Sequence, residues 1–447
     1  MATVFLNSNK VLVHPSILFS KSIFSFQKLL QINEQNPAHA VFLIYLSLDM
    51  RYMPVKPNIS FENLEVAFAS KSDAELRKMH LIFGTMNNNT LVSLGVKLAN
   101  LAFKLRLPIK GIMKKTMFGH FCGGETIADC QPTLDTLAKY HIRTILDYSV
   151  EGEGNEESFD ATKREILRTI ERSAGDGNMP FGVFKVTGLG DFELMTKIQE
   201  GKKLDKKEQE AFENIKSRVD ELCKKGFASK TKVLVDAEES WFQDVIDQMA
   251  YVAMEKYNRE NCIVYNTYQM YRHDMLDRLK DAHKTALEKG YLLGAKLVRG
   301  AYMEKERKRA LEMAYPSPIQ PNKAASDRDY DAALRYCLEN KDSIHLVCGS
   351  HNEQSNKLLT ELISLHGLQP ADERIYFAQL YGMSDNISFN LAKAGYNVAK
   401  YVPYGPVEKV MPYLGRRAEE NTSVSGQSSR EFDLIKREIA RRKTAKS

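Results

Sequence analysis

The sequence lacks the features that mark several large classes of protein. Its six cysteines are scattered and no two have CxxC spacing, which argues against a zinc site and a disulfide framework and fits a reducing compartment. The net charge of +6 is small for 447 residues, and Lys and Arg are interleaved with Asp and Glu along almost the whole chain. This pattern argues against a nucleic-acid-binding protein. We therefore predict a protein with neither a bound metal nor a nucleic-acid partner.

Long apolar runs are also missing. The run from Ala40 to Leu48 is too short to span a bilayer. A mitochondrial transit peptide is usually rich in arginine, whereas no arginine precedes Arg51 here. Residues 1–56 are predicted to be a poorly ordered leader, or an extension upstream of a start near Met50 or Met53, and the sequence leaves both interpretations open.

Residues 57–140 have the spacing of an N-terminal helical segment. Within it, the stretch KLRLPIKGIMKKTMFGHF, residues 104–121, is both basic and apolar. One interpretation is the solvated face of an ordinary helix, which the composition favours. The other is a patch that lies on a membrane surface.

From residue 141 onward, short apolar or β-branched runs alternate with longer amphipathic, charge-rich segments. The eight runs are IRTILDYS, FGVFKVTG, KVLVDAEE, CIVYNTYQ, AKLVRGAY, IHLVCGSH, RIYFAQLYG and NVAKYVPYG. Such alternation indicates βα units around a parallel sheet, and eight units over about 270 residues match the length of a (β/α)8 barrel. We predict an α/β fold with this barrel over residues 141–447; a doubly wound open sheet is the competing fold.

A polar or charged side chain follows every predicted strand. These residues are Asp147, Lys185, Asp236, Asn266 with Gln269, Arg299 with Tyr302, His351, Gln379, and Tyr401 with Tyr404. In a barrel the carboxyl ends of the strands build the active site. The predicted mouth is rich in cations, namely Lys185, Lys296, Arg299, His351, Arg416 and Arg417. We expect a phosphate or carboxylate ligand to neutralise them.

Seven stretches make the chain resemble the proline dehydrogenase family. They are KVLVDAEES, NTYQMY, GAKLVRGAYMEKER, SHNE, QLYGMSDNISF, AGYNVAKYVPYGPV and YLGRRAEEN. The resemblance covers residues 61 to 447 and is strongest from Val233 onward. It implies an FAD enzyme that oxidises L-proline to Δ1-pyrroline-5-carboxylate, with a distorted (β/α)8 barrel whose last helix covers the mouth. Because no aldehyde dehydrogenase domain follows, the chain is similar to the monofunctional members.

The resemblance also implies roles for individual residues. Lys185, Arg416 and Arg417 would bind the substrate carboxylate. Asp236, Tyr302 and Tyr401 would surround the proline ring, with Glu420 orienting the arginines, although Asp236 also fits a structural partner of a barrel lysine. The residues expected to hold FAD are Asn266, Gln269, Lys296, Val298, Arg299 and His351. Lys296 or Arg299 would stabilise the reduced flavin, with phosphate binding as the alternative role.

The resemblance leaves other points open. A membrane quinone is the expected electron acceptor, and a separate pyrroline-5-carboxylate dehydrogenase is an expected partner. The location would be the cytoplasm, at the inner face of a bacterial plasma membrane, or the mitochondrial matrix and inner membrane. A hydroxyproline dehydrogenase is the nearest alternative, but such relatives have a smaller residue where this chain has Tyr401. A non-redox flavin- or phosphate-binding barrel is a more distant one. Met303 and Asn266 replace the Trp and Gln of some bacterial relatives, so the flavin contacts there would differ.

Overall fold

The computed structural model describes residues 59–86, 107–150, 154–423 and 427–446, with backbone alone for 418–423 and 427–429. It also describes positions 95, 98, 102 and 105, and the strands β1 (Phe5–Asn7) and β2 (Lys10–Leu12), which pair antiparallel. Residues 1–56 and 57–447 form separate compact units. The prediction of a leader over residues 1–56 lies, apart from this hairpin, outside the described residues.

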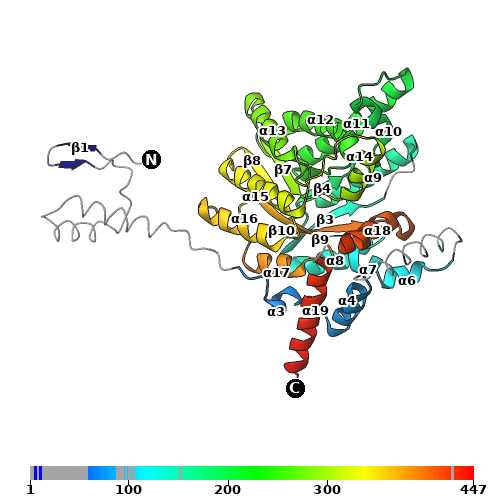
Figure 1. Ribbon diagram of the computed structural model, residues 1–447, viewed down its shortest axis with the longest axis vertical. Coiled ribbons are helices and arrows are strands. Elements are labelled where there is room, and N and C mark those ends of the chain that lie inside the picture. The colour runs from blue at the N-terminus through cyan, green and yellow to red at the C-terminus, as the bar shows by residue number, and fades with distance from the viewer. Residues whose placement is uncertain are drawn as a thin grey trace. The chain divides into compact units, whose positions relative to one another are not determined.

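Eight parallel strands close into a barrel (Figure 1). They are β3 (Ile142–Tyr148), β4 (Phe181–Phe184), β5 (Lys232–Val235), β6 (Val264–Gln269), β7 (Leu293–Val298), β8 (Ile344–Gly349), β9 (Ile375–Leu380) and β10 (Val398–Tyr404). The last strand pairs with the first, with Val398 opposite Ile142. This closure confirms the predicted barrel and excludes the doubly wound open sheet, in which the first and last strands would not pair.

Helices surround the barrel and fill the connections between its strands. They are α8 (Gln131–Lys139), α9 (Glu156–Ser173), α10 (Phe192–Gln199), α11 (Lys206–Ser229), α12 (Ser240–Tyr257), α13 (Met275–Lys289), α14 (Met303–Glu312), α15 (Lys323–Glu339), α16 (Glu353–Leu365) and α17 (Asp385–Lys393). Their starts follow local capping chemistry: Asn155 accepts from the Ser158 backbone N–H in a capping box at α9. Amphipathic faces then pack on the strands, for example through Ile166 and Ile170 of α9.

The barrel interior is a packed core. Phe181, Tyr265, Tyr376 and Tyr401 fill it and are almost fully buried, as expected for a barrel of eight strands. Gly294 makes room for Tyr265, because a Cβ at residue 294 would lie 2.8 Å from the Tyr265 Cγ. Ligands must therefore bind above this core, at the carboxyl ends of the strands.

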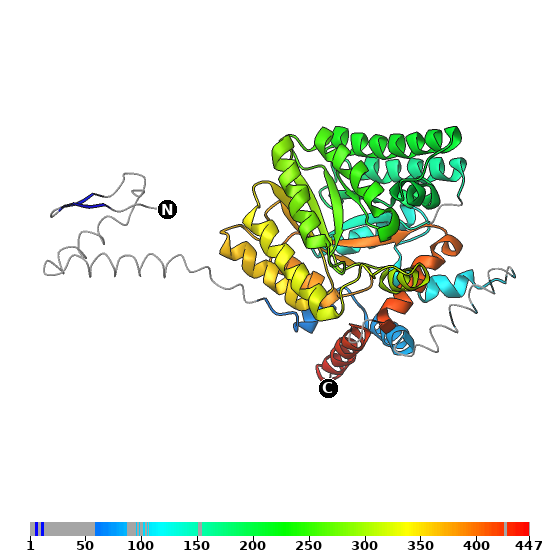
Figure 2. The ribbon, with the colours of Figure 1, turned by 45° about the horizontal axis from the view of Figure 1, so that its top comes forward.

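A second core joins helices from both ends of this unit. Helices α3 (Leu64–Ala67), α4 (Asp73–Met86), α6 (Lys110–Lys115) and α7 (Phe118–Phe121) contribute to it together with α18 (Val407–Ser423) and α19 (Gln427–Thr444). Helices α4 and α19 lie side by side in both views (Figures 1 and 2). Phe83, Phe121, Val410 and Leu434 are fully buried in this core. It holds α18, the helix that carries Arg416 and Arg417, against the barrel.

Candidate active site

A buried network joins four strands at the mouth of the barrel. The Lys185 ammonium, after β4, donates to Asp236 Oδ2, after β5, at 3.0 Å. Lys296 in β7 donates to Asp236 Oδ1 at 2.5 Å and to the Tyr401 hydroxyl of β10 at 2.7 Å. The Lys185 Nζ also lies 3.8 Å from Oδ2 of Asp147, which belongs to β3. Barrel closure therefore brings together four of the predicted site residues, and Asp147 joins them.

The charges in this network stabilise one another. Burial alone would raise the pKa of Asp236, but the ammonium groups of Lys296 and Lys185 hold it below its usual value. Burial works against the charge of Lys185, but Asp147 and Asp236 outweigh it and raise the Lys185 pKa. Burial dominates at Lys296 and lowers its pKa, in spite of Asp236. The mouth is thus an ion cluster with its own carboxylates, and its positive charge is smaller than the sequence alone implied.

Tyr302 lies beside this network at the N-terminus of α14. Its phenol is half-buried. Burial and the nearby Glu238 raise its pKa, while the charges of Lys185 and Arg416 work in the opposite direction. Lys185 and Arg416, from distant parts of the sequence, are therefore both within electrostatic reach of one phenol at the mouth.

The two adjacent arginines of α18 face different groups. Arg416 is half-buried and acts on Tyr302. Arg417 is 6% exposed, stacks with its guanidinium carbon 5.3 Å from the centre of the Tyr413 ring, and its charge acts on His351. A rotation of about 100° per helical residue separates their side chains. The Glu420 side chain lies outside the described residues, so its predicted role as a brace stays a prediction.

Two amides predicted to hold the cofactor have buried oxygen atoms without a partner. Asn266 donates its Nδ2 hydrogen to Asp247 at 2.8 Å, and Gln269 donates to the Glu238 carbonyl at 3.0 Å. Their oxygens, Asn266 Oδ1 and Gln269 Oε1, accept no hydrogen bond from any residue that the structure describes. Buried acceptors are costly unless a donor satisfies them. Val298, half-buried at the end of β7, is the register neighbour of Gln269. These residues fit a polar ligand that carries an N–H group, such as the flavin ring.

Arg299 is held more rigidly than the sequence indicated. Its guanidinium donates to Asp327 at 2.7 Å, to the Ser350 hydroxyl at 2.9 Å and to the Ser355 hydroxyl at 3.0 Å. Its central carbon also stacks 4.4 Å from the centre of the Tyr330 ring. Arg299 is therefore fixed as a planar cation between β7 and β8.

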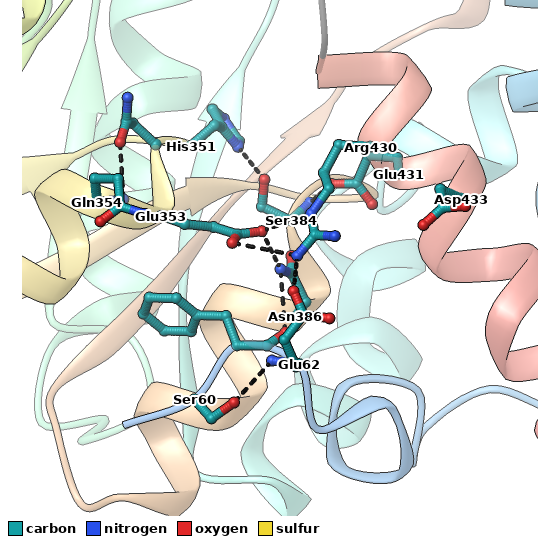
Figure 3. A network of polar contacts seen from close by, with 12 residues as sticks. Ser60, Glu62, His351, Glu353, Gln354, Ser384, Asn386, Arg430, Glu431 and Asp433 are labelled. Carbon is teal, nitrogen blue, oxygen red and sulfur yellow. Dashed lines mark hydrogen bonds and ion pairs between the residues drawn. The ribbon is translucent and has the colours of Figure 1, made fainter. Parts of the chain in front are cut away.

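His351, which follows β8, points toward the loop before α17 (Figure 3). Its Nδ1 lies 2.8 Å from the Ser384 hydroxyl. Burial, together with the charges of Lys400, Arg417 and Arg299, lowers its pKa to about 3. The imidazole is consequently neutral at physiological pH.

The last two strand-end residues lie away from this network. Tyr404 donates to Glu165 of α9 at 3.1 Å, and Gln379 donates to the Ser350 carbonyl at 3.0 Å. Both contacts tie strands to their neighbours. A polar residue at a strand end is therefore a useful signal but does not by itself mark a ligand contact.

Two buried glutamates were not predicted as site residues. Glu238 accepts from the Thr187 backbone N–H at 3.0 Å and from the Thr187 hydroxyl, and burial raises its pKa to about 7. Glu306 accepts from the Ser240 backbone N–H and hydroxyl, both at 2.6 Å, and fastens α14 to the start of α12. The second acid in the stretch DAEES was a usable signal for Glu238. Nothing in the sequence singled out Glu306 among the charges of α14.

Comparison with known proteins gives consistent matches. The family model for proline dehydrogenase matches residues 130–430. Proline dehydrogenase 1 of Dictyostelium discoideum, named as mitochondrial, is 33% identical, over 84% of this chain and 74% of that protein. The carbapenem antibiotics biosynthesis protein CarD of Pectobacterium carotovorum is 34% identical, over 72% of this chain and 83% of that protein. Hydroxyproline dehydrogenase of Xenopus laevis is 31% identical, over 84% and 88%.

The fold also matches a solved structure. Proline utilization A from Bdellovibrio bacteriovorus superimposes with a TM-score of 0.62 over 86% of this chain, at 19% sequence identity. The chain spans 42% of the length of that larger protein. Within the residues described here, no helix is both long and apolar enough to cross a membrane.

Proposed function

The chain belongs to the proline dehydrogenase family, and on that premise we propose that it oxidises L-proline to Δ1-pyrroline-5-carboxylate with FAD as its cofactor. The observation that carries the proposal is the network of Lys185, Asp236, Lys296 and Tyr401 at the mouth, with Arg416 nearby. Bound FAD would supply the acceptor for the hydride that leaves the ring carbon next to nitrogen.

The substrate carboxylate is the strongest handle on proline, and cations are its natural partners. We assign this contact to Lys185 and Arg416, because both act on Tyr302 and so converge on one place. Arg417 contributes from the His351 side. Asp236 orients the two lysines, and Tyr302 and Tyr401 form the wall around the ring. A proline amine that enters this cationic site is expected to lose its proton, because burial and nearby positive charge favour its neutral form.

The remaining predicted residues would hold FAD. Asn266 and Gln269 offer buried acceptors, and Val298 lies beside them. Lys296 lies in β7, beside the strand that carries Asn266 and Gln269, whereas Arg299 is held toward β8 by Ser350 and Ser355. We therefore assign the cation near the flavin N1–C2 edge to Lys296. Arg299 would then contact the phosphates, and His351, whose Nε2 is an acceptor, a hydroxyl of the ribityl chain. Their rigid hydrogen bonds would reduce the entropic cost of binding.

One experiment tests cofactor and substrate together. The purified protein should show a flavin absorption spectrum, and anaerobic addition of L-proline should bleach it, because hydride transfer reduces the ring. D-proline is the control, since the carboxylate clamp would place its ring carbon wrongly. A colourless protein, or a spectrum that L-proline leaves unchanged, would contradict the proposal.

Hydroxyproline is the second candidate substrate, since a hydroxyproline dehydrogenase is among the similar proteins. The buried Tyr401 favours proline, because its ring occupies space that a ring hydroxyl would need. The ratio of kcat/KM for the two substrates decides between them.

We further propose that a membrane quinone accepts the electrons and that α6, together with Leu107 just before it, docks on the membrane. Leu107 and Ile112 expose 50% and 65% of their surface, although the neighbouring Lys110 and Lys114 are partly neutralised by Glu125. The mitochondrial inner membrane is the favoured location, because several relatives are named as mitochondrial. A separate pyrroline-5-carboxylate dehydrogenase would consume the product. The double variant L107S/I112S should lower activity with membrane quinone and spare activity with a soluble dye; equal losses would contradict docking.

A further inference from the structure

A chain of hydrogen bonds leads from the barrel mouth to the C-terminal helix. His351 Nδ1 contacts the Ser384 hydroxyl at 2.8 Å, and the Ser384 backbone N–H donates to Glu431 of α19 at 2.5 Å (Figure 3). Ser384 has a left-handed backbone, with φ of 52°, a strained conformation for a residue with a side chain. This backbone conformation turns its N–H toward Glu431.

The contacts of His351 define its tautomer. The Leu380 backbone N–H points at His351 Nε2 over 3.5 Å, so Nε2 is the acceptor. Nδ1 then carries the hydrogen and donates to the Ser384 oxygen.

The position of Glu431 is fixed by its helix. Glu431 is 4% exposed. The neighbouring Arg430 pairs with Glu353 at 3.0 Å and with Glu62, and Glu353 begins α16 two positions after His351. Helix α19 therefore contacts the His351 loop through two consecutive residues, one by an ion pair and one through Ser384.

We propose that Glu431 is a positioning residue for the mouth, which acts through Ser384 to hold His351 as the Nδ1–H tautomer with Nε2 as an acceptor. The inference rests on the proposed role of His351 in cofactor binding. Glu431 lies outside the barrel, on a helix to which the predicted site did not extend. The packing of α19 against the barrel would therefore be needed to position His351.

The surroundings of Glu431 make the Glu431–Ser384–His351 contacts sensitive to pH. Burial and the adjacent Asp385 raise its pKa to about 7, although the Ser384 hydrogen bonds and Lys400 act in the opposite direction. His351 itself stays neutral, because burial and the charges of Lys400, Arg417 and Arg299 lower its pKa. When Glu431 gains a proton, its hydrogen bond with the Ser384 N–H weakens, and the Ser384 hydroxyl is held less firmly as the acceptor for Nδ1–H. The His351 tautomer, rather than its charge, should then change.

Nitrogen NMR of the full-length protein with 15N-labelled histidine tests the proposal directly. The His351 signal is identified by its loss in H351Q. Wild type should hold the Nδ1–H tautomer at about pH 8 and lose it toward about pH 6. E431Q, which preserves shape and still accepts the Ser384 N–H, should show a tautomer ratio that no longer changes over this range. S384G, which removes the hydroxyl and suits the left-handed backbone, should have the same effect.

D433N is the matched control. Asp433 lies on the same helix, its side chain is 49% exposed, and it makes ion pairs with Lys436 and Arg437. It should leave the His351 tautomer as in wild type. An E431Q spectrum with an unchanged pH response, or an equal effect of D433N, would overturn the proposal. The readout does not need flavin, so failure of the proposed function, seen as a colourless protein, is distinguishable from failure of this inference.

Discussion

Two buried clusters in this protein have the same composition and differ in what surrounds them. At the mouth, Asp236 lies between Lys185 and Lys296. Beside β10, Asp385 lies between Lys400 at 2.9 Å and Lys71 at 3.8 Å. In both clusters the lysines hold the aspartate pKa below its usual value, against the effect of burial.

The difference lies in how the lysines use their remaining hydrogens. Lys400 is fully buried and also donates to the carbonyls of Leu380 and Met383, so all three of its hydrogens are occupied by protein. The Lys185 side chain is 30% exposed and pairs with two carboxylates on one side. The Asp385 cluster is closed and stabilises the loop after β9. The Asp236 cluster at the mouth is open to a ligand. Substitutions should separate the two roles.

The largest effect is expected in the closed cluster. K400M removes the cation and leaves Asp385 buried with a single distant partner, and it should lower the free energy of unfolding by about 3–5 kcal/mol. Urea denaturation measures this change. K71M is the matched control, because Lys71 is farther from Asp385 and should cost much less. If the two variants unfolded at the same urea concentration, Lys400 would not be the main partner that stabilises buried Asp385.

The next effect concerns a carboxyl group close to the open cluster. The pKa of Glu238 is raised from 4.5 to about 7, so the folded state binds a proton more tightly than the unfolded chain. The contribution of Glu238 to stability is therefore present below about pH 4.5 and is lost as the pH rises through about 7, by up to about 3 kcal/mol. E238Q should reduce this decline in unfolding free energy between pH 5 and pH 8. An unchanged slope would show that Glu238 titrates normally.

The open cluster should control substrate affinity more than stability. R416M should raise KM for L-proline at least tenfold, because it removes a charged hydrogen bond worth about 1.5–3 kcal/mol, while flavin content stays normal. R417M is its comparison: Arg417 acts on His351 rather than Tyr302, so it should reduce flavin content more than R416M does. Steady-state kinetics and the flavin-to-protein ratio measure both. If R416M and R417M changed KM and flavin content equally, the two arginines would not have the separate roles proposed for them.

The smallest effect is a change of specificity. Y401S removes the ring that lies over Lys296 in the open cluster, and should shift the ratio of kcat/KM for proline to that for hydroxyproline by about tenfold toward hydroxyproline. Y404S is a control on the same strand, because Tyr404 contacts α9 instead. An unchanged ratio in Y401S would remove Tyr401 from substrate selection.

The sequence was sufficient to predict the barrel, since hydrophobic runs and helical spacing are local patterns. It also placed Lys185, Asp236, Lys296 and Tyr401 at the correct strands. It did not predict which of them pair, because Lys296 and Tyr401 are 105 positions apart and meet only when the barrel closes. Asp385 and Lys400 are much closer in sequence, but no pattern in the sequence marks them as a pair. The sequence also could not predict the burial of individual side chains. The raised pKa of Glu238, for example, depends on the packing around it.

The core shared by α4 and α19 has a consequence for how the protein is made. Arg442 of α19 donates to Asp73, at the start of α4, at 2.9 Å, and the two residues are 369 positions apart. Contacts of such long range form late, because the closure of a long loop is entropically costly. During synthesis the apolar face of α4 stays uncovered until α19 has left the ribosome. The enzyme would therefore acquire its complete active site only in the last step of folding.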